Sequence, residues 1–401
     1  VEEEVAALRR AVSEMEARYR AEIERLEERI AALESDRPSP AGASAGEPGA
    51  SDEAARLRAA ARAAAAPTEA VPPPDVAGGR QRNLNRLNPE ISATGIFAGI
   101  ASDLEREEFE RGEFELDLQA TLDPFSSMRW TIAFTEEGEV EIEEGYLTYS
   151  ALPGGLSLTA GRFRQRFGAL NRQHVHALPQ TSYPLALARV FGEEGLGQTG
   201  IGASWLLPRP WASANEIVVE ITDGENEFFG GESFDDFALL ARLKNFWEVS
   251  SSTYVEWGLS GMDGRTESGE EARLWGSDLT LHWRPPQRAK YREITWRTEA
   301  LLAERAEADG LLREAWGGYS YLEGLVARNL YVGVRYDWSE DPLDPTSEAW
   351  AVVPYVTWWQ SEWVRLRGEF ERRQDDALGE TENRFTLQLT WAAGPHKHET
   401  Y

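Results

Sequence analysis

Apolar and polar residues alternate along most of the chain beyond residue 90. In the segment 113–122, apolar residues occupy every second position from Phe114 to Leu122, and polar residues fill the positions from Glu113 to Thr121. Because successive side chains of a β-strand point to opposite faces, this period of two predicts a strand with one apolar and one polar face. The pattern recurs in about sixteen segments between residues 91 and 393, each near the ~10 residues that a tilted strand needs to cross a bilayer.

The polar faces of these segments are densely charged, for example at Arg335 and Asp337 or at Arg365 and Arg367. Unpaired charge is prohibitive in the core of a soluble β-sandwich or propeller, whereas it costs little in a water-filled lumen. The chain also lacks the blade repeat of a propeller. The predicted fold is therefore an all-β transmembrane barrel of about 16 antiparallel strands, whose even number returns the chain to the rim where the barrel begins.

The connections between the segments alternate in length. "DPFSS", "LPGG", "RPPQRA", "ARN" and "QSE" are tight turns, and the connections between these turns are mostly longer and acidic. Short periplasmic turns and longer outer loops are typical of outer-membrane barrels. Three places fit less well: segment 91–101 is rich in Gly and Ala, the phase changes near Glu143 and Glu144, and Pro354 interrupts a strand. A bulge or a sheet edge is expected at each.

Three other segments flank the predicted barrel of residues 91–393. Residues 1–34 show the 4-3 apolar spacing and charged outer positions of an α-helical coiled coil, with a lone amphipathic helix as the alternative. Residues 35–90 are rich in Pro, Ala, Gly and Ser and predict a linker. Residues 394–401 form a short C-terminal tail. We expect the coiled coil to be periplasmic and to mediate oligomerisation.

Composition narrows the function classes. The chain carries 41 Lys and Arg against 69 Asp and Glu, and this net charge of −28 argues against a nucleic-acid partner. It contains no cysteine, which excludes disulfides and Cys-based zinc sites. No run of ~18 apolar residues occurs, so no transmembrane helix is expected. The 15 Trp, 15 Phe and 12 Tyr suit the aromatic girdles of a membrane barrel.

One stretch, "GRFRQRFGALNRQHVHALP" at residues 161–179, concentrates positive charge in this acidic chain. It ends the fifth predicted strand and opens the longest connection, about residues 168–197. Arg162, Arg164 and Arg166 share one parity and are expected to face the lumen, whereas Phe163 and Phe167 share the other and are expected to face lipid. Two leucines upstream, at positions 156 and 158, fall in the arginine parity, so this interpretation requires a bulge or an apolar patch near the rim.

The strand that reads "LTAGRFRQRFG" resembles the strand motif of the phosphate-selective (O/P-type) group of the trimeric outer-membrane porins. The likeness covers residues 91–391 as architecture and this one short motif in sequence. In such porins the third outer loop folds into the barrel and sets its narrowest point, so the resemblance implies a constriction between cationic and acidic side chains. The cationic set is Arg162, Arg164, Arg166, Arg172 and Arg189, and the acidic set is Glu113, Glu115, Asp117, Glu141 and Glu143. Charge rings of this kind set selectivity in pores. The chain lacks the long ladder of lysines and arginines of a phosphate channel.

The histidines are the other candidates for chemistry. His174 and His176 form an H-x-H pair, which on an extended segment supplies half of a zinc or copper site. No third ligand stands nearby in the sequence, so a surface or loop-packing role is favoured, and no cofactor is expected. His282 faces the predicted lumen, but no Ser and acid partner stands at a spacing that supports nucleophilic chemistry, so an enzyme is not expected.

The favoured function is an outer-membrane porin, a water-filled channel for passive diffusion of small polar or ionic solutes with a constriction at its third loop. The layout is also similar to that of plug-free siderophore porins, so a TonB-independent uptake channel for a siderophore or another chelate is one alternative. An envelope tether whose barrel is only an anchor is another. The expected location is the bacterial outer membrane, with the N-terminal segment in the periplasm. The expected partners are further copies in a homotrimer, outer-membrane lipid and lipopolysaccharide, and peptidoglycan or another envelope protein at the coiled coil.

Overall fold

The structure of the chain is a computed structural model that describes residues 89–104, 108–110, 112–135, 138–231, 236–306, 311–344, 346–377 and 379–394. The predicted coiled coil of residues 1–34 lies outside the described residues. So do residues 35–88 of the predicted linker and residues 395–401 of the predicted tail.

Seventeen strand segments form one antiparallel sheet. They are β1 (Glu90–Ser102), β2 (Glu108–Glu110), β3 (Phe114–Thr121), β4 (Ser126–Phe134), β5 (Val140–Leu152), β6 (Leu156–Arg164), β7 (Gly197–Leu207), β8 (Ala214–Thr222), β9 (Ala238–Ser250), β10 (Thr253–Arg265), β11 (Glu271–Trp283), β12 (Glu293–Ala306), β13 (Leu312–Ala327), β14 (Leu330–Glu340), β15 (Glu348–Trp359), β16 (Val364–Asp375) and β17 (Glu380–Ala393). Short helices are η1 (Pro153–Gly155), η2 (Val175–Ala177), α4 (Leu185–Phe191) and η3 (Pro286–Arg288). Among the described residues, no helix is both long and apolar enough to cross a membrane.

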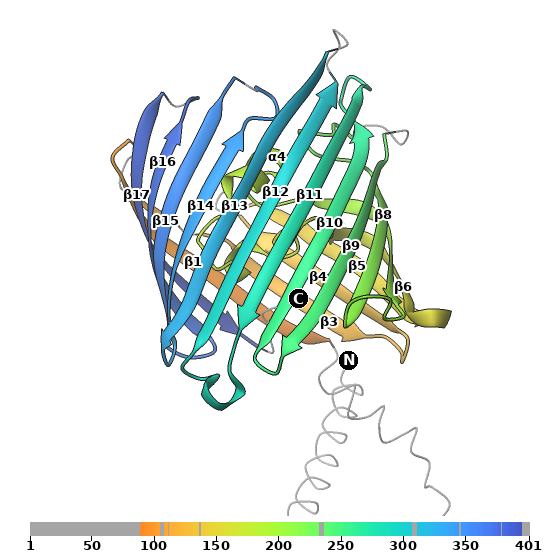
Figure 1. The fold of residues 1–401 in the computed structure, drawn as a ribbon, viewed down its shortest axis with the longest axis horizontal. Helices are drawn as coiled ribbons and strands as arrows, with labels where there is room; N and C mark the ends of the chain where they lie inside the picture. Colours follow the sequence, from red (N-terminus) through yellow and green to blue (C-terminus); the bar gives the residue numbers. More distant parts are fainter. Residues whose placement is uncertain are drawn as a thin grey trace, which may run out of the picture. The chain divides into compact units, whose positions relative to one another are not determined.

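The sheet closes on itself, as Figure 1 shows, because β17 pairs with β1. β2 and β3 both pair with β1, Phe109 opposite Gly99 and Phe114 opposite Gly95, and so occupy one position in the wall. The result is a closed antiparallel barrel with sixteen strand positions, which confirms the predicted strand number. Closure leaves no row of unpaired backbone N–H and C=O groups, which a membrane-spanning sheet cannot tolerate.

The two rims differ as the sequence predicts. Ala93 at the start of the barrel pairs with Ala393 at its end, so both ends of the barrel lie at the rim of the tight turns. One of these turns uses Asn329 with a φ of 74°, a left-handed conformation that Asn tolerates better than most residues. The longest connection at the opposite rim joins β6 to β7 and comprises residues 165–196. Other loops there are shorter than expected because the strands run further: only residues 266–270 join β10 to β11.

The alternation along each strand separates an outer apolar face from an inner polar face. Trp275 and Leu322 on the outer face are 51% and 50% exposed, whereas Arg335 and Asp337 on the inner face are 1% and 0% exposed. Exposed apolar side chains outside and charged side chains inside are the reverse of a soluble protein and match a barrel in lipid.

Two of the irregular places have clear outcomes. In β5, Thr131 pairs with Glu144 and Ile132 with Ile142, so that Glu143 is an extra residue in a β-bulge, as expected from the phase change. At Pro354 the expectation of a bulge or an edge is wrong. The register of β15 against β16 is the same before and after it, because the missing proline N–H removes a ladder bond without moving the strand.

The lumen contains an apolar cluster that the alternation of the strands does not predict. Loop 165–196 folds back into the barrel, where Figure 1 shows α4 between the near and far walls. Its apolar side chains pack against inward-facing positions of β9 to β13. The fully buried members from the loop include Phe167, Leu170, Leu178 and Leu187, and those from the wall include Leu240, Met262, Leu274 and Leu301. The loop is therefore held by hydrophobic burial as well as by polar contacts.

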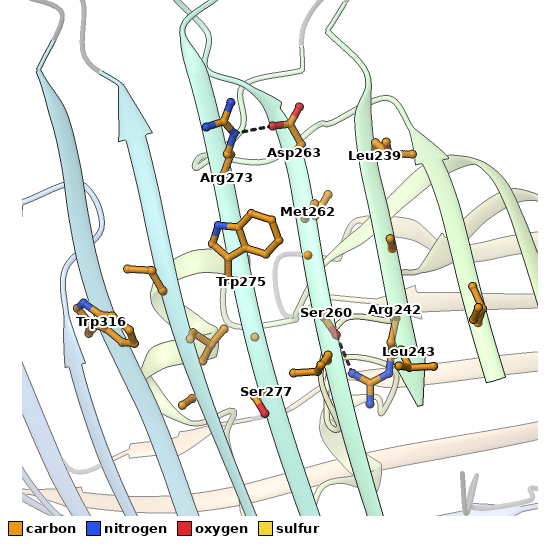
Figure 2. A pocket seen from close by; sticks show the side chains of 18 of the residues that line it. Leu239, Arg242, Leu243, Ser260, Met262, Asp263, Arg273, Trp275, Ser277 and Trp316 are labelled. Carbon is orange, nitrogen blue, oxygen red and sulfur yellow. Dashed lines mark hydrogen bonds and ion pairs between the residues drawn. The ribbon is translucent and has the colours of Figure 1, made fainter. Parts of the chain in front are cut away.

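An apolar groove of about 820 Å³ lies on the outer face of β9 to β13 (Figure 2). Trp211, Trp275 and Trp316 line it, each about half exposed, together with small residues such as Ala241 and Gly261. Such a surface matches lipid tails and offers almost no polar group to a solute. The groove belongs to the outer wall of the barrel and not to the site described below.

The assignment of the outer face can be tested at Leu322, which lies in the middle of β13. We expect Leu322→Arg to lower the free energy of unfolding in lipid vesicles by ~2–4 kcal/mol, because it places a charge in the apolar band. Urea unfolding followed by tryptophan fluorescence measures the loss. Thr295→Arg is the matched control, since Thr295 faces the lumen opposite Glu323; it removes the contact of Thr295 with His282 but should lower the stability much less than Leu322→Arg. Equal losses for the two variants would contradict the assignment.

Candidate functional site

Loop 165–196 leaves the wall at a narrow neck. The Gln165 N–H donates to the Leu196 carbonyl at 3.1 Å. The Asn171 side-chain amide donates to the carbonyls of Gln165 and Leu196 at 2.8 and 3.0 Å. Gly168 then allows the chain to turn inward. Its φ is +61°, and a Cβ there would lie 1.7 Å from a carboxylate oxygen of Glu299, so no other residue fits. The neck fixes where the loop enters the lumen.

The arginines of the stretch 161–179 do not share one orientation. Arg164 is buried, and its Nη2 lies 3.1 Å from Glu143 Oε2. Arg166 is 27% exposed and pairs with Glu216 at 2.7 Å. Arg162 pairs in register with Thr199 and follows the exposed Leu158 and Ala160, so it has the outward parity. The expectation that all three face the lumen is therefore wrong for Arg162, which lies 3.7 Å from the exposed Glu225.

The two phenylalanines of this stretch correct the prediction further. Phe163 is 5% exposed and packs edge-on against Tyr146, and Phe167 is fully buried in the apolar cluster of the lumen. Neither faces lipid. β6 ends at Arg164, so the alternation of the strand does not extend to Phe167. Within β6 the outward-facing residues are those that share the parity of the apolar Leu158, and Phe163 has the other parity.

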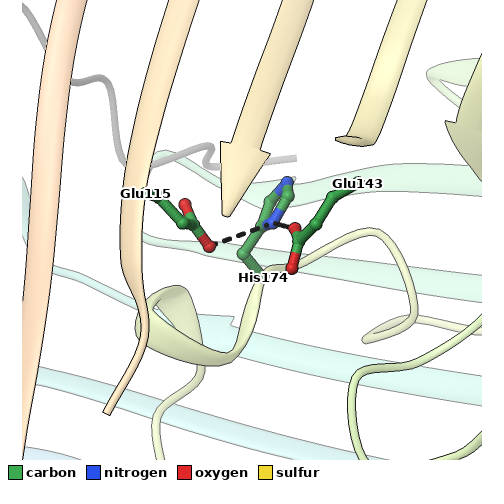
Figure 3. Close-up of side chains that lie close together, drawn as sticks. All are labelled: Glu115, Glu143 and His174. Atoms are coloured by element: carbon green, nitrogen blue, oxygen red, sulfur yellow. Dashed lines mark ion pairs between the residues drawn. The ribbon is translucent and has the colours of Figure 1, made fainter. Parts of the chain in front are cut away.

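Acidic and histidine side chains meet where the loop contacts β3 and β5. We call Glu115, Glu143, Glu144, His174 and His176 the acid–histidine cluster; all five are buried. The His174 Nδ1 lies 2.6 Å from Glu143 Oε2 and 3.4 Å from Glu115 Oε1, the contacts drawn in Figure 3, and its Nε2 lies 3.0 Å from Glu144 Oε2. The β5 bulge makes this possible, because it turns two consecutive glutamates toward the lumen.

His174 lies in the loop, outside the strands, and its pKa reflects this crowding. Burial and the nearby Arg164 lower the pKa, but the negative charges of Glu115 and Glu143 outweigh both, so the pKa of His174 is raised well above its usual range. The carboxylates around His174 therefore favour a positive charge at this place.

His176 continues the cluster. Its Nδ1 lies 3.0 Å from Glu115 Oε1, and its ring stacks on that of His174 with 5.6 Å between the ring centres. Asp117 is connected through Arg129, which lies 2.9 Å from Asp117 and 3.6 Å from Glu144. The partners of the H-x-H pair thus come from strands remote in the sequence.

Three arginines of β14 and β16 bind the backbone of the loop. Arg367 donates to the carbonyl of Leu178 at 2.8 Å and to that of Gln180 at 2.5 Å, and Arg365 donates to the His176 carbonyl at 2.6 Å. Arg335 donates to the Ser182 carbonyl at 2.7 Å. The sequence marks these arginines only as parts of charged strand faces, because the carbonyls that they bind carry no signal in the pattern of side chains.

The end of the loop has its own anchor. Arg189 of α4 donates to the Ser339 carbonyl at 2.8 Å and to Asp375 at 3.0 Å. The Thr181 N–H donates to Glu369 at 3.0 Å. Since the loop also contacts β3 and β5, it crosses the lumen from one wall to the other.

The ten residues predicted for the constriction therefore divide into groups. Arg164, Glu113, Glu115, Asp117 and Glu143 lie in or beside the acid–histidine cluster. Arg166 and Arg172 line a small polar recess in the lumen together with Glu220. The other three are separate: Arg189 binds the opposite wall, Glu141 is exposed, and Arg162 has the outward parity.

The remaining lumen histidine, His282, has only local contacts. Its Nδ1 lies 3.0 Å from Thr295 Oγ1, its ring stacks on Tyr254 with 4.7 Å between the centres, and its Nε2 lies 3.8 Å from Glu293. These contacts agree with the interpretation of a paired lumen histidine.

Solved structures with this architecture are outer-membrane porins and channels. OprB of Pseudomonas putida matches with a TM-score of 0.56 at 8% identity, covering 79% of this chain and 97% of that one. OmpF of Salmonella typhi matches with a TM-score of 0.52 at 8% identity, covering 77% and 99%. The outer membrane channel DcaP of Acinetobacter baumannii matches with a TM-score of 0.50 at 11% identity, covering 77% and 98%. At such identities the likeness establishes the porin barrel fold alone.

Sequence comparison finds one partial relative. An uncharacterized protein of Aquifex aeolicus (strain VF5) is 32% identical over 204 residues, which make up 45% of this chain and 42% of that protein. The chain thus spans less than half the length of this relative. No protein-family model matches the chain. Membership of the O/P-type group stays a prediction.

The backbone anchors of the loop can be tested by hydrogen exchange. Arg367→Ala removes charge-assisted bonds worth ~1.5–3 kcal/mol each, so amides of residues 176–183 should exchange at least ~10-fold faster. Arg372→Ala on the same strand is the matched control, because Arg372 is exposed and donates to Asn383 instead. Unchanged exchange in Arg367→Ala would show that the apolar cluster alone holds the loop.

Proposed function

We propose that this protein is an outer-membrane porin, a channel for passive diffusion of small polar or ionic solutes, with loop 165–196 as its constriction. The observation that carries the proposal is the loop itself, which crosses the lumen of a sixteen-strand barrel and is bonded to both walls. A charged inner face is tolerable where water fills the lumen. The solved barrels of similar architecture are outer-membrane proteins, which supports the same location for this chain. The resemblance to the O/P-type porins adds the third-loop constriction.

Exposure decides which charges act on solutes. Arg164 is 4% exposed and paired with Glu143, so its charge is neutralised and does not reach the water of the lumen. Arg166 is 27% exposed and lines the polar recess with Arg172 and Glu220. Solutes that pass the constriction meet Arg166 and Arg172 on one side, and rings of such charges set selectivity in pores.

The assembly and the surroundings follow from the same proposal. A homotrimer in outer-membrane lipid and lipopolysaccharide is the expected form, and a trimer form is described for OmpT of Vibrio cholerae, a protein of similar architecture with a TM-score of 0.52. The N-terminal segment would lie in the periplasm, with peptidoglycan or another envelope protein as its partner.

A second candidate function is supported by the apolar cluster. The loop packs against β9 to β13 through fully buried apolar side chains, which closes part of the lumen to water. If the rest is closed too, the barrel serves as an anchor for an envelope tether. A narrow opening that a chelate fits would instead favour the ligand-specific uptake channel.

Swelling of liposomes separates these functions. For a porin we expect vesicles that contain the protein to swell in small neutral sugars, at rates that fall as the sugar becomes larger. Absence of swelling in every solute supports the tether and overturns the porin. Block of single-channel current by a ferric chelate at low concentration, with no block by the free metal or the free ligand, supports the specific channel.

Reversal potential tests the role of Arg166. Under a salt gradient in planar bilayers, Arg166→Glu should shift the reversal potential toward cation permeation, because it reverses a charge beside the constriction. Arg372→Glu makes the same change of charge at an exposed residue of the outward parity of β16 and should leave the reversal potential unchanged. A shift of equal size in both variants would mean that total charge, and not the constriction, sets the preference.

A further inference from the structure

Three potential metal ligands converge inside the acid–histidine cluster. Ligand atoms of Glu115, Glu143 and His174 all lie within 4.8 Å of one another (Figure 3). Two of them, His174 Nδ1 and Glu115 Oε1, are 3.4 Å apart. Ligands that bind Zn²⁺ at ~2.0–2.2 Å in a tetrahedral arrangement stand about 3.3–3.6 Å from each other, so this pair fits one small ion. The 2.6 Å between His174 Nδ1 and Glu143 Oε2 is too short for two ligands of one ion, so Glu143 would bind it through Oε1.

Two buried atoms of the cluster make no hydrogen bond. Glu143 Oε1 and His174 Nδ1 make no hydrogen bond, although the two side chains are only 6% and 4% exposed. The 2.6 Å contact between His174 Nδ1 and Glu143 Oε2 thus lacks the geometry of a hydrogen bond. Buried polar atoms without partners are rare and costly, and an ion is one of the partners that satisfies them.

The groups around these atoms are arranged as in a metal site. The His174 Nε2 lies 3.0 Å from Glu144 Oε2, and a histidine that binds a metal through one nitrogen commonly donates its other N–H to a carboxylate. The Glu115 carboxylate is likewise bonded by His176, at 3.0 Å. Arg164 holds the second oxygen of Glu143, which leaves Oε1 available. Each of the three ligands is thereby oriented by a neighbour.

From this arrangement we infer that Glu115, Glu143 and His174 bind a divalent transition-metal ion of the Zn²⁺ type, with a fourth position open to water. The imidazole nitrogen selects this class over Ca²⁺ and Mg²⁺, which prefer oxygen ligands alone. Two carboxylates balance the charge of the ion, which takes the place of the proton on His174 Nδ1.

The position of the site defines its effect. Glu115 belongs to β3 and Glu143 to β5, whereas His174 belongs to loop 165–196. The bound ion therefore ties the loop to β3 and β5, apart from the anchoring arginines of β14 and β16, and its removal frees that side of the loop. The inference goes beyond the proposed channel function, since an ion that clamps the loop does so whether or not solutes pass.

Metal content of the purified full-length protein tests the inference. After equilibrium dialysis against Zn²⁺ and removal of free metal, elemental analysis should give one Zn²⁺ per chain, and His174→Ala and Glu143→Gln should each lose it. His396→Ala/His398→Ala is the matched control, because it removes the other H-x-H pair of the chain and should retain the ion. His282→Ala should retain it as well.

Two further measurements keep the result decisive if a variant fails to fold. The unaltered protein loaded with Co²⁺ should show the visible absorption of an ion with inner-sphere nitrogen and oxygen ligands, and Zn²⁺ should abolish it. Chelation should speed hydrogen exchange of residues 172–178 while β-sheet circular dichroism stays the same. Absence of stoichiometric Zn²⁺, or its retention in folded His174→Ala and Glu143→Gln, overturns the inference. Liposome swelling does not enter this test, so the porin proposal fails or stands separately.

Discussion

Hydrogen bonds from arginine side chains to the backbone of one loop organise the lumen of this barrel. Irregular backbone inside a barrel needs donors for its carbonyls, because the backbone N–H groups of the wall strands already bond to neighbouring strands. Arg365 and Arg367 supply donors to residues 176–180, and Arg335 supplies one to Ser182. The guanidinium fork suits this task, since it presents several N–H groups at fixed angles and keeps its charge when buried. The path of the loop through the lumen depends on these bonds.

Different kinds of interaction hold the two sides of the loop. On the side of β14 and β16, buried arginines bind neutral carbonyls, whereas on the side of β3 and β5 acidic side chains surround His174 and His176. Between them, apolar side chains of the loop pack on an apolar strip of the wall. A loop anchored in these three ways differs from a mobile flap. In the structure, Arg166 stays partly exposed beside the loop.

Much of the fold could be predicted because it follows from the period of two. Strand number, tight turns and the position of the longest loop all come from the pattern of apolar residues and turn residues, which are local properties. The parity of Arg162 and Phe163 does not follow their charge and aromatic character; it follows Leu158, whose apolar side chain marks the outward face of β6. The anchoring arginines were visible only as charge, since their partners are carbonyls.

The sequence by itself determined a closed barrel of sixteen strand positions with short turns at one rim and a long loop at the other. Apolar and charged residues alternate along many strands, and a closed barrel in a membrane places all the apolar faces outside and all the charged faces inside. Only the tertiary structure decided what the stretch 161–179 meets. His174 finds Glu115, Glu143 and Glu144 because a bulge in β5 turns two glutamates inward, the ladders from β3 through β4 to β5 set their register, and the loop folds back onto them. Contacts between residues so distant in the chain depend on register and closure, and no local pattern encodes them.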